Sequence, residues 1–202
     1  ADHAVAEVPQ FMVDQKIPAG NLRQAYLQSG LMDLLKTYYP DKQLVDKLSN
    51  DQLFFNTEVF GTDPRTSGVD YLVASELVKN YLLKQEGIAD VYTRQTILAA
   101  DFNEGGIKGM VKRGYHPKRS GDLAVILEPS WGGWSAVQGT SHGSAYTYDT
   151  HVPVLFYGKG IPTGHSVKRY DITDIAPTLS VLLTIKFPNG CTGNPVQEIF
   201  EK

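Results

Sequence analysis

The sequence predicts an α/β fold, in which helices cover a layered sheet and a peripheral α+β lobe lies beside that sheet. Two apolar runs of strand length, residues 123–127 and 152–157, show no alternation of polar and apolar side chains. Such runs are typical of strands that are covered on both faces. A third observation is an apolar series with helical spacing that starts at Val69. With 42% hydrophobic and 20% charged residues among 202, the chain can bury a substantial core.

Three elements are predicted in the first part of the chain. Apolar residues with helical spacing follow Asn21, and Pro40 ends them, which predicts a helix between these positions. Residues 52–60 are aromatic and β-branched and therefore predict a strand. Residues 67–70, Ser-Gly-Val-Asp, match a capping box, and the apolar series that follows predicts a helix for which Gly87 is the natural C-cap.

The second part is predicted to contain strands and one helix. We expect the two apolar runs, residues 123–127 and 152–157, to be neighbouring and mostly parallel strands. Residues 171–174 include two aspartates and precede the apolar series 175–183. Acidic side chains suit a helix N-terminus, and Pro177 falls in the first turn, where proline is tolerated. We expect the boundary between the two parts near residues 115–121.

Composition and charge exclude several classes of protein. A net charge of −3 gives no reason to expect a binder of nucleic acid or of anionic membranes. No apolar run approaches the roughly 20 residues of a membrane span. The single cysteine, Cys191, excludes an internal disulfide and a cysteine-rich zinc site, so the ligands of any bound metal must be histidine and carboxylate. Because the chain begins Ala1-Asp2-His3 without an initiator methionine or a signal sequence, we expect a mature product or a piece of a longer protein.

Two of the five histidines are candidates for metal binding. His3 follows Asp2, so a carboxylate oxygen and an imidazole nitrogen lie at adjacent positions and can reach one divalent cation where the backbone turns. His142 lies in a loop of small residues, 138–144, which exposes its ring and lets other groups approach. Each signal alone is weak, because most histidines are surface residues or have their hydrogen bonds satisfied in the core.

Other candidates favour structural interpretations. Asp149-Thr150-His151 has residue types that bind metals, but His151 adjoins a predicted buried strand, and a structural hydrogen bond is the better interpretation. His165 lies in a glycine-rich turn and is expected to be solvated. The basic residues between 108 and 119 could attract an anionic substrate, but a solvated face explains such a run better. Ser141 adjoins His142, yet sequence neighbours rarely place a hydroxyl on its own base, so we reject a hydrolase dyad there.

Several segments together resemble the alkaline phosphatase superfamily, and within it the bacterial phosphate-irrepressible alkaline phosphatases, which are related to the nucleotide pyrophosphatase/phosphodiesterases. Residues 114–188 resemble this family almost continuously, and residues 10–113 match it more loosely. The specific feature is an Asp-His pair followed far downstream by Ser-His-Gly. The matching stretches are residues 1–9, 114–122, 139–143, 148–158 and 171–179.

The resemblance implies two Zn²⁺ ions held by six protein ligands in the full-length enzyme. Asp2 and His3 match ligands of one metal, which also contacts the nucleophile, and His142 matches a ligand of the other. Two cations spaced for in-line displacement stabilise the attacking and leaving oxygens of a phosphoryl group. Imidazole and carboxylate together suit Zn²⁺ better than Mg²⁺ or Ca²⁺.

The resemblance also implies a division of the chain. Residues 1–9 would carry the strand-end metal-ligand motif of the core, residues 10–113 a peripheral or cap lobe, and residues 114–202 the C-terminal part of the α/β core. In the family the nucleophile, the phosphate-binding cations and the remaining metal ligands precede the Asp-His pair, and they are absent here. We therefore expect the C-terminal part of an enzyme, whose missing N-terminal part is its partner, with weak zinc binding or none by this chain alone.

The resemblance implies a zinc-dependent phosphatase that hydrolyses phosphate monoesters through a phospho-enzyme, in the periplasm or outside the cell. The residues that separate this activity from that of a phosphodiesterase or nucleotide pyrophosphatase lie outside the chain, so that alternative stays open. A non-catalytic metal-binding or interaction module is the second class of function. The spatial expectation is that Asp2, His3 and His142 converge while His151 and His165 stay apart from them.

Overall fold

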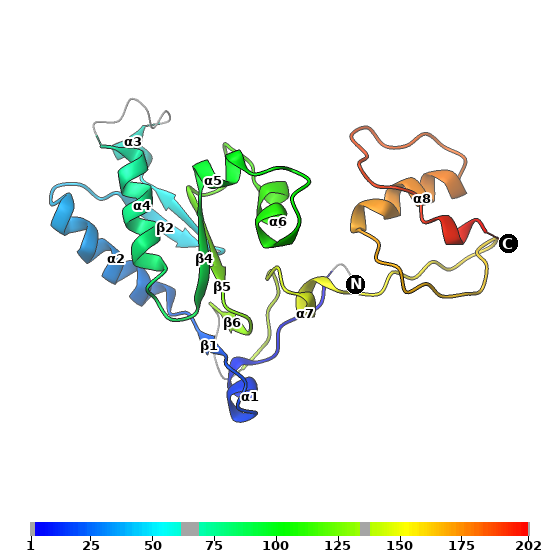
Figure 1. Ribbon diagram of the computed structural model, residues 1–202, viewed down its shortest axis with the longest axis horizontal. Helices are drawn as coiled ribbons and strands as arrows, with labels where there is room; N and C mark the ends of the chain where they lie inside the picture. Colours follow the sequence, from blue (N-terminus) through cyan, green and yellow to red (C-terminus); the bar gives the residue numbers. More distant parts are fainter. Residues whose placement is uncertain (1–2, 62–68, 134–137, 202) are drawn as a thin grey trace. The chain divides into compact units, whose positions relative to one another are not determined.

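The computed structural model describes residues 3–61, 69–133 and 138–201. The chain separates into two compact units, one spanning His3–His151 and the other beginning at Val152 (Figure 1). Both contain helices, while the strands belong to the first unit. The α/β class is thus confirmed as a mixed fold of helices and open sheets. Among the described residues, no helix has the length and apolar character that crossing a membrane requires.

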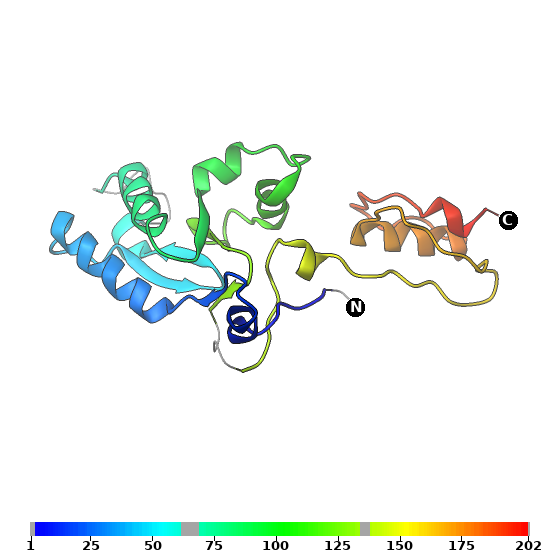
Figure 2. The ribbon, with the colours of Figure 1, turned by 60° about the horizontal axis from the view of Figure 1, so that its bottom comes forward.

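The first unit begins with a short helix and ends with another. Its elements in chain order are α1 (Pro9–Asp14), β1 (Gly20–Asn21), α2 (Gln24–Tyr38), β2 (Val45–Ser49), β3 (Gln52–Phe55), α3 (Thr57–Phe60), α4 (Tyr71–Leu82), β4 (Ile88–Thr93), α5 (Arg94–Ala99), α6 (Gly106–Gly114), β5 (Leu123–Leu127), β6 (Trp131–Gly132) and α7 (Thr147–Thr150). The helix α1 lies beside β1, outside the main sheet (Figures 1 and 2).

The main sheet has the strand order β2-β3-β5-β4, and every pair of neighbours is antiparallel. Asn50 and Asp51 join β2 to β3, and both have positive φ angles, of 50° and 55°. Positive φ at both central residues is the hairpin geometry that matches the twist of two antiparallel strands. At the centre of the sheet, Leu53 of β3 pairs with Leu123 of β5.

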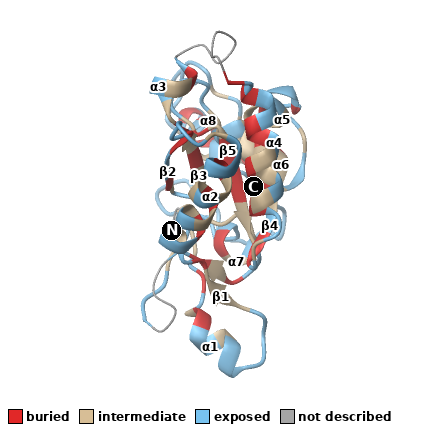
Figure 3. Cartoon of the chain, turned by 90° about the vertical axis from the view of Figure 1, so that its left-hand side faces the viewer, coloured by how far each residue is buried: buried red, intermediate tan, exposed pale blue. Residues whose placement is uncertain are grey.

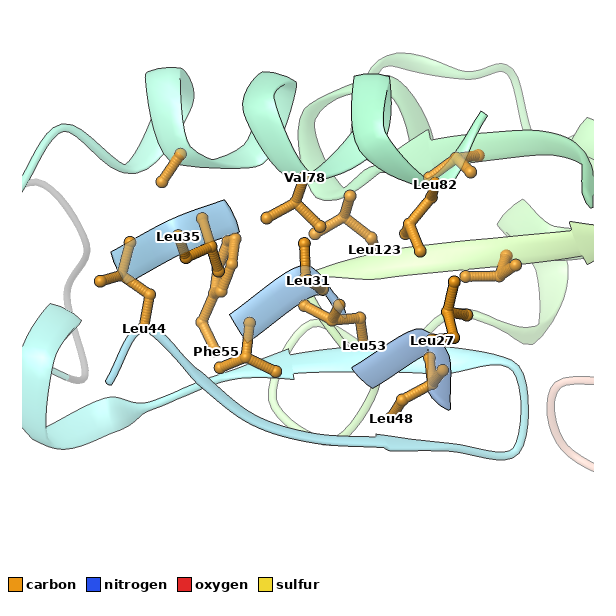
Figure 4. Close-up of a cluster of buried hydrophobic side chains, with 14 of the residues drawn as sticks. Leu27, Leu31, Leu35, Leu44, Leu48, Leu53, Phe55, Val78, Leu82 and Leu123 are labelled. Carbon is orange, nitrogen blue, oxygen red and sulfur yellow. The ribbon is translucent and has the colours of Figure 1, made fainter. Parts of the chain in front are cut away.

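The hydrophobic core lies where α2 and α4 meet this sheet (Figure 4). The helix α2 contributes Leu27, Leu31 and Leu35, at steps of four residues that place them on one helical face. Val78 and Leu82 of α4 repeat this spacing. Buried residues follow the strands and the helices packed on them, while Pro9 is the buried residue of α1 (Figure 3). The core is therefore built within the first unit.

The predicted helices of the first unit are confirmed, with shifted ends. The helix α2 begins one residue after Arg23 rather than directly after Asn21. The helix α4 is capped by Asp70, whose carboxylate accepts hydrogen bonds from two backbone N–H groups of the first turn. The Ser67 position of the predicted capping box lies outside the described residues. The prediction of Gly87 as the C-cap is wrong, because α4 ends at Leu82 and Gly87, with a φ of +84°, lies directly before β4.

Two predicted strands need correction. The strand predicted for residues 52–60 ends at Phe55, because the side chain of Asn56 accepts a hydrogen bond from the backbone N–H of Glu58 and caps α3. The strand predicted for residues 152–157 is not formed among the described residues, where this segment belongs to no ladder and the predicted pairing with β5 is not made. An apolar run forms a strand only where another strand satisfies its backbone groups.

The sheet neighbours of β5 lie on the other side of the predicted boundary near residues 115–121. Both sheet neighbours of β5, the strands β3 and β4, precede this boundary in the chain. The main sheet therefore crosses it, and the two units of the structure divide after His151 instead. The assignment of residues 10–113 to a cap lobe and of residues 114–202 to the core of a longer enzyme stays a prediction.

The second unit contains a short 3-10 helix, η2 (Ile172–Asp174), the helix α8 (Ile175–Leu182) and a further 3-10 turn, η3 (Gln197–Ile199). The helix predicted after residue 174 is confirmed. Backbone N–H groups of the C-terminal tail bind this helix, since Asn194 donates to the Asp174 carboxylate at 2.8 Å and Val196 donates to the Thr178 hydroxyl at 2.9 Å. Side-chain acceptors on η2 and α8 thus fix the tail.

Candidate metal site

The structure brings two of the three predicted ligands together. The imidazole rings of His3 and His142 stack with their centroids 3.6 Å apart and their planes 16° apart. The expected convergence of these two side chains is therefore confirmed. Asp2 lies outside the described residues, and the metal-binding role of all three residues stays a prediction. The exposed His142 ring and the half-buried His3 ring form a pair at the edge of the first unit.

Backbone hydrogen bonds hold the two histidine segments side by side, although they lie far apart in the sequence (Figure 1). The N–H of Ala4 donates to the carbonyl of Asp149 at 2.8 Å, and the N–H of Ala6 donates to the carbonyl of Ser141 at 2.8 Å. The hydroxyl of Thr140 donates to the carbonyl of Ala6. These hydrogen bonds lie close to both histidines in the sequence. They therefore fix the position of the backbone from which each imidazole extends.

The loop that carries His142 is folded onto a buried carboxylate. One oxygen of Asp149, Oδ2, accepts hydrogen bonds from the N–H groups of Gly143 and Ser144, each at 2.6 Å. Asp149 belongs to the one-turn helix α7 and is only 2% exposed. Gly143 has a φ of +109°, a conformation that favours glycine. Sequence reasoning considered Asp149 only as a neighbour of His151 and missed this contact.

Two imidazoles are the described part of the predicted donor set, and imidazole is a common zinc ligand. Nδ1 of His3 lies 2.7 Å from the carbonyl oxygen of Ala4, and because a carbonyl can only accept, Nδ1 is the donor. The lone pair of the neutral ring is then on Nε2. Histidines that bind a metal through one ring nitrogen commonly donate the other ring N–H to a carbonyl in this way. Lone pairs of two nearly parallel rings lie in separate planes, so one cation cannot lie in both. The stacking suits two neighbouring cations, and the ions of two-metal sites lie about 3.5–4 Å apart.

The described residues contain only part of such a site. Within residues 3–61, 69–133 and 138–201, no three His, Cys, Asp or Glu side chains are grouped so that they could hold a metal ion. His151, directly after α7, and His165, in the second unit, are both exposed. For His165 this agrees with the predicted solvated turn. Further ligands would have to come from Asp2 or from residues outside the described ranges.

A cavity of about 370 Å³ adjoins the loop of His142 in the first unit. Met110 and Tyr115, from α6 and its C-terminal end, form part of its wall, together with Ile126 of β5 and Tyr146. The Tyr146 hydroxyl donates to the carbonyl of Leu127 at 2.8 Å, and burial raises the pKa of this phenol. The wall is mostly apolar and contains His142 as well.

The basic run between residues 108 and 119 is largely engaged in local contacts. Lys108 forms an ion pair with Glu104 at 3.3 Å, and Nζ of Lys112 donates to the carbonyl of Leu98 at 2.8 Å. Arg113 donates to the carbonyls of Phe102 and Glu104 at 3.2 and 3.1 Å. These contacts hold α6 against α5 and the loop that follows it. They favour the structural interpretation of the run over an anion-binding one.

Comparison with known proteins places the chain in the alkaline phosphatase superfamily. The crystal structure of wild-type alkaline phosphatase PafA matches all of this chain with a TM-score of 0.86 at 32% identity, and the match covers 37% of that chain. The chain belongs with the bacterial alkaline phosphatases of this kind in both sequence and fold. No family model matches the chain.

Two of three curated relatives that match along nearly the whole chain are named as alkaline phosphatases. Alkaline phosphatase PafA of Elizabethkingia meningoseptica is 32% identical over 98% of this chain, and alkaline phosphatase PhoV of Synechococcus elongatus is 31% identical over 100% of it. A protein of Myroides odoratus named as a calcium-transporting ATPase is 34% identical over 100% of this chain. The chain spans only 35–36% of the length of these relatives.

Proposed function

We propose that the protein to which these residues belong is a zinc-dependent phosphatase that hydrolyses phosphate monoesters through a phospho-enzyme. The observation that carries this proposal is the stacked pair of His3 and His142, in a chain that matches 37% of alkaline phosphatase PafA along all of its own length. The relatives' names support the phosphatase class. The family supports, for the same protein, a location in the periplasm or outside the cell.

In this proposal Asp2 and His3 hold one zinc ion, and His142 is a ligand of a second. When bound, such a pair of ions supplies positive charge to the attacking and leaving oxygens of the phosphoryl group. This chain's contribution is to orient the two imidazoles. The backbone ladder from Ala4 and Ala6 sets their separation, and the contact between Nδ1 of His3 and its neighbouring carbonyl fixes the tautomer. In this proposal the nucleophile and the Lys and Arg side chains that bind the phosphate lie in the part of such enzymes that these residues do not span.

That remaining part is also the proposed partner of the second unit. The segment 152–157 is apolar, yet Leu155 is 88% exposed. The helix α8 likewise exposes Leu179 and Val181. Apolar surface of this kind on a compact fold marks an interaction site. We propose that strands from the missing part of the enzyme pair with residues 152–157 and cover this surface.

The test is a chimera in which these 202 residues replace the corresponding part of PafA. We expect the chimera to hydrolyse an aryl phosphate monoester in the presence of zinc, and His142→Ala or His3→Ala to lower kcat/KM by at least about 100-fold. An aryl phosphate diester, assayed in parallel, separates the diesterase alternative. A folded chimera with full activity in both histidine variants would refute the proposal.

The 202-residue chain alone provides a second test. Phosphoryl transfer depends almost entirely on positioning and charge stabilisation, and this chain lacks the nucleophile and the cationic groups that supply them in the family. We therefore expect no hydrolysis above background, even with added zinc. Turnover that disappears in the His142→Ala variant would mean that this chain contains a complete site of its own.

A further inference from the structure

Asp149 is the residue that touches both histidine segments. Its backbone carbonyl accepts the N–H of Ala4, next to His3, and its carboxylate accepts the N–H groups of Gly143 and Ser144, which directly follow His142. We propose that Asp149 is a positioning residue for the metal ligands, which orients His142 beside His3 and supplies negative charge to the cation there. This inference rests on the proposed function, because it assumes that the histidines bind metal.

The geometry of the loop supports a dedicated contact. Two consecutive N–H groups converge on a single carboxylate oxygen at 2.6 Å, a distance at the short end for bonds of this kind. This convergence depends on Gly143, whose φ of +109° turns its own N–H and the next one toward the same side. The backbone on the C-terminal side of His142 is therefore fixed to α7, while the carbonyl of Ser141, on its other side, is fixed to Ala6.

The charge of Asp149 supports a role beyond that of a loop tie. The side chain is almost fully buried, and burying a carboxylate is costly unless other groups compensate its charge. Among the described residues, no lysine or arginine forms an ion pair with it. The two N–H groups stabilise the charge without neutralising it. A cation near His142 would compensate the remaining negative charge of Asp149. A neutral side chain at position 149 would not attract a cation in this way.

The experiment uses the 202-residue chain, labelled for NMR, with three variants. Asp149→Ala removes the contact, and Asp149→Asn keeps an oxygen that can accept both N–H groups but removes the charge. Asp70→Ala is the matched control, because this carboxylate also accepts two backbone N–H groups but caps α4, which contributes neither histidine. The first readout is the NOE between the His3 and His142 rings and the amide exchange of Gly143 and Ser144, without metal. The second is the Kd for Zn²⁺ of the chimera with PafA, which carries the same substitutions, because the 202-residue chain alone is expected to bind zinc weakly or not at all.

We expect Asp149→Ala to weaken the ring–ring NOE, to accelerate exchange of both amides at least tenfold, and to raise the Kd for Zn²⁺ by about 10–100-fold. Asp149→Asn is expected to keep the NOE and to raise the Kd at least threefold. Asp70→Ala is expected to leave both readouts unchanged. Folded Asp149→Ala protein with an unchanged NOE and an unchanged Kd would overturn the inference.

The experiment still tests the inference if one variant does not fold or if no Zn²⁺ binds. Where Asp149→Ala does not fold, an unchanged Kd in Asp149→Asn overturns the charge role, and a raised Kd with an intact NOE supports it. If the unsubstituted chimera binds no Zn²⁺, the metal role in the proposed function fails. The NOE and the amide exchange then still decide whether Asp149 positions His142.

Discussion

Substituting Tyr71 tests the interactions that join the first turn of α4 to the sheet. The Tyr71 hydroxyl donates to Oδ1 of Asp122 at 2.6 Å, and Oδ2 of the same carboxylate accepts the N–H of Phe55 at 2.8 Å. A hydrogen bond to a charged group contributes about 1.5–3 kcal/mol. Because Phe retains the buried ring, which is 6% exposed, we expect Tyr71→Phe to lower the free energy of unfolding by that amount. Removing both bonds with Asp122→Ala should cost about 3–6 kcal/mol.

The assay is urea unfolding at pH 7, followed by circular dichroism. The double variant Tyr71→Phe/Asp122→Ala should be about as stable as Asp122→Ala alone, because the bond that links the two residues is already lost. Tyr26→Phe is the control, since Tyr26 is 79% exposed and its substitution should change stability by less than about 0.5 kcal/mol. A Tyr71→Phe protein as stable as the unsubstituted chain would refute the reasoning.

The same pair predicts a dependence on alkaline pH. Burial, and then the hydrogen bond to Asp122, raise the pKa of Tyr71 above its ordinary value of 10. The folded state therefore keeps the phenol proton at pH values where the unfolded chain loses it, and the contribution of Tyr71 to stability falls as the pH rises above 10. The stability difference between the unsubstituted chain and Tyr71→Phe should shrink over that range. A difference that is constant up to pH 11 would contradict the assignment.

Three other predictions concern single positions. Leu53→Ala should lower the free energy of unfolding by about 2–5 kcal/mol, because Leu53 is fully buried, while Leu155→Ala should change it by less than about 0.5 kcal/mol; urea titrations of both variants check this. Gly143→Ala should cost about 1–3 kcal/mol in the same titration, because an alanine at a φ of +109° is strained. Hydrogen bonds from Lys168 and Tyr170 lower the pKa of Glu198 to about 2. The contribution of Glu198 to stability is therefore present above pH 4.5 and lost as the pH falls through 2. Lys168→Met should return the midpoint of the Glu198 titration, followed by NMR, toward 4.5.

Local patterns predicted the helices α2, α4 and α8, but neither the shorter helices nor the strand pairing of the sheet. The apolar spacing of α2 and α4 reports which face is buried, and the packing of Leu31 and Val78 on one sheet follows from it. Strand pairing depends on residues far away in the chain. The run at residues 123–127 is buried because it lies between β3 and β4, whereas the similar run at residues 152–157 has no ladder with any part of the chain that the structure describes. Hydrophobicity alone cannot separate these two cases.

In the candidate site, the sequence indicates the residues that are recognised by their side-chain chemistry, but not the one whose role depends on backbone geometry. His3 and His142 could be selected from the sequence because their residue types and their motifs carry the chemistry. The role of Asp149 could not, because its partners are backbone N–H groups, which every residue except proline has. A glycine followed at a short distance by aspartate is the signal that remains, and it occurs in many turns.

The short pairing of β1 with β6 has a consequence for how the protein can vary in evolution. Gly20 lies opposite Trp131, so the chain enters and leaves the intervening segment at adjacent points. That segment contains the whole buried cluster from Leu22 to Val125, while the two histidines lie outside it. An insertion with its own core and adjacent ends can be lengthened, shortened or exchanged with little effect on the residues that flank it. Sequence change in that segment then reaches the two histidines through few contacts, such as that of Tyr146 with Leu127.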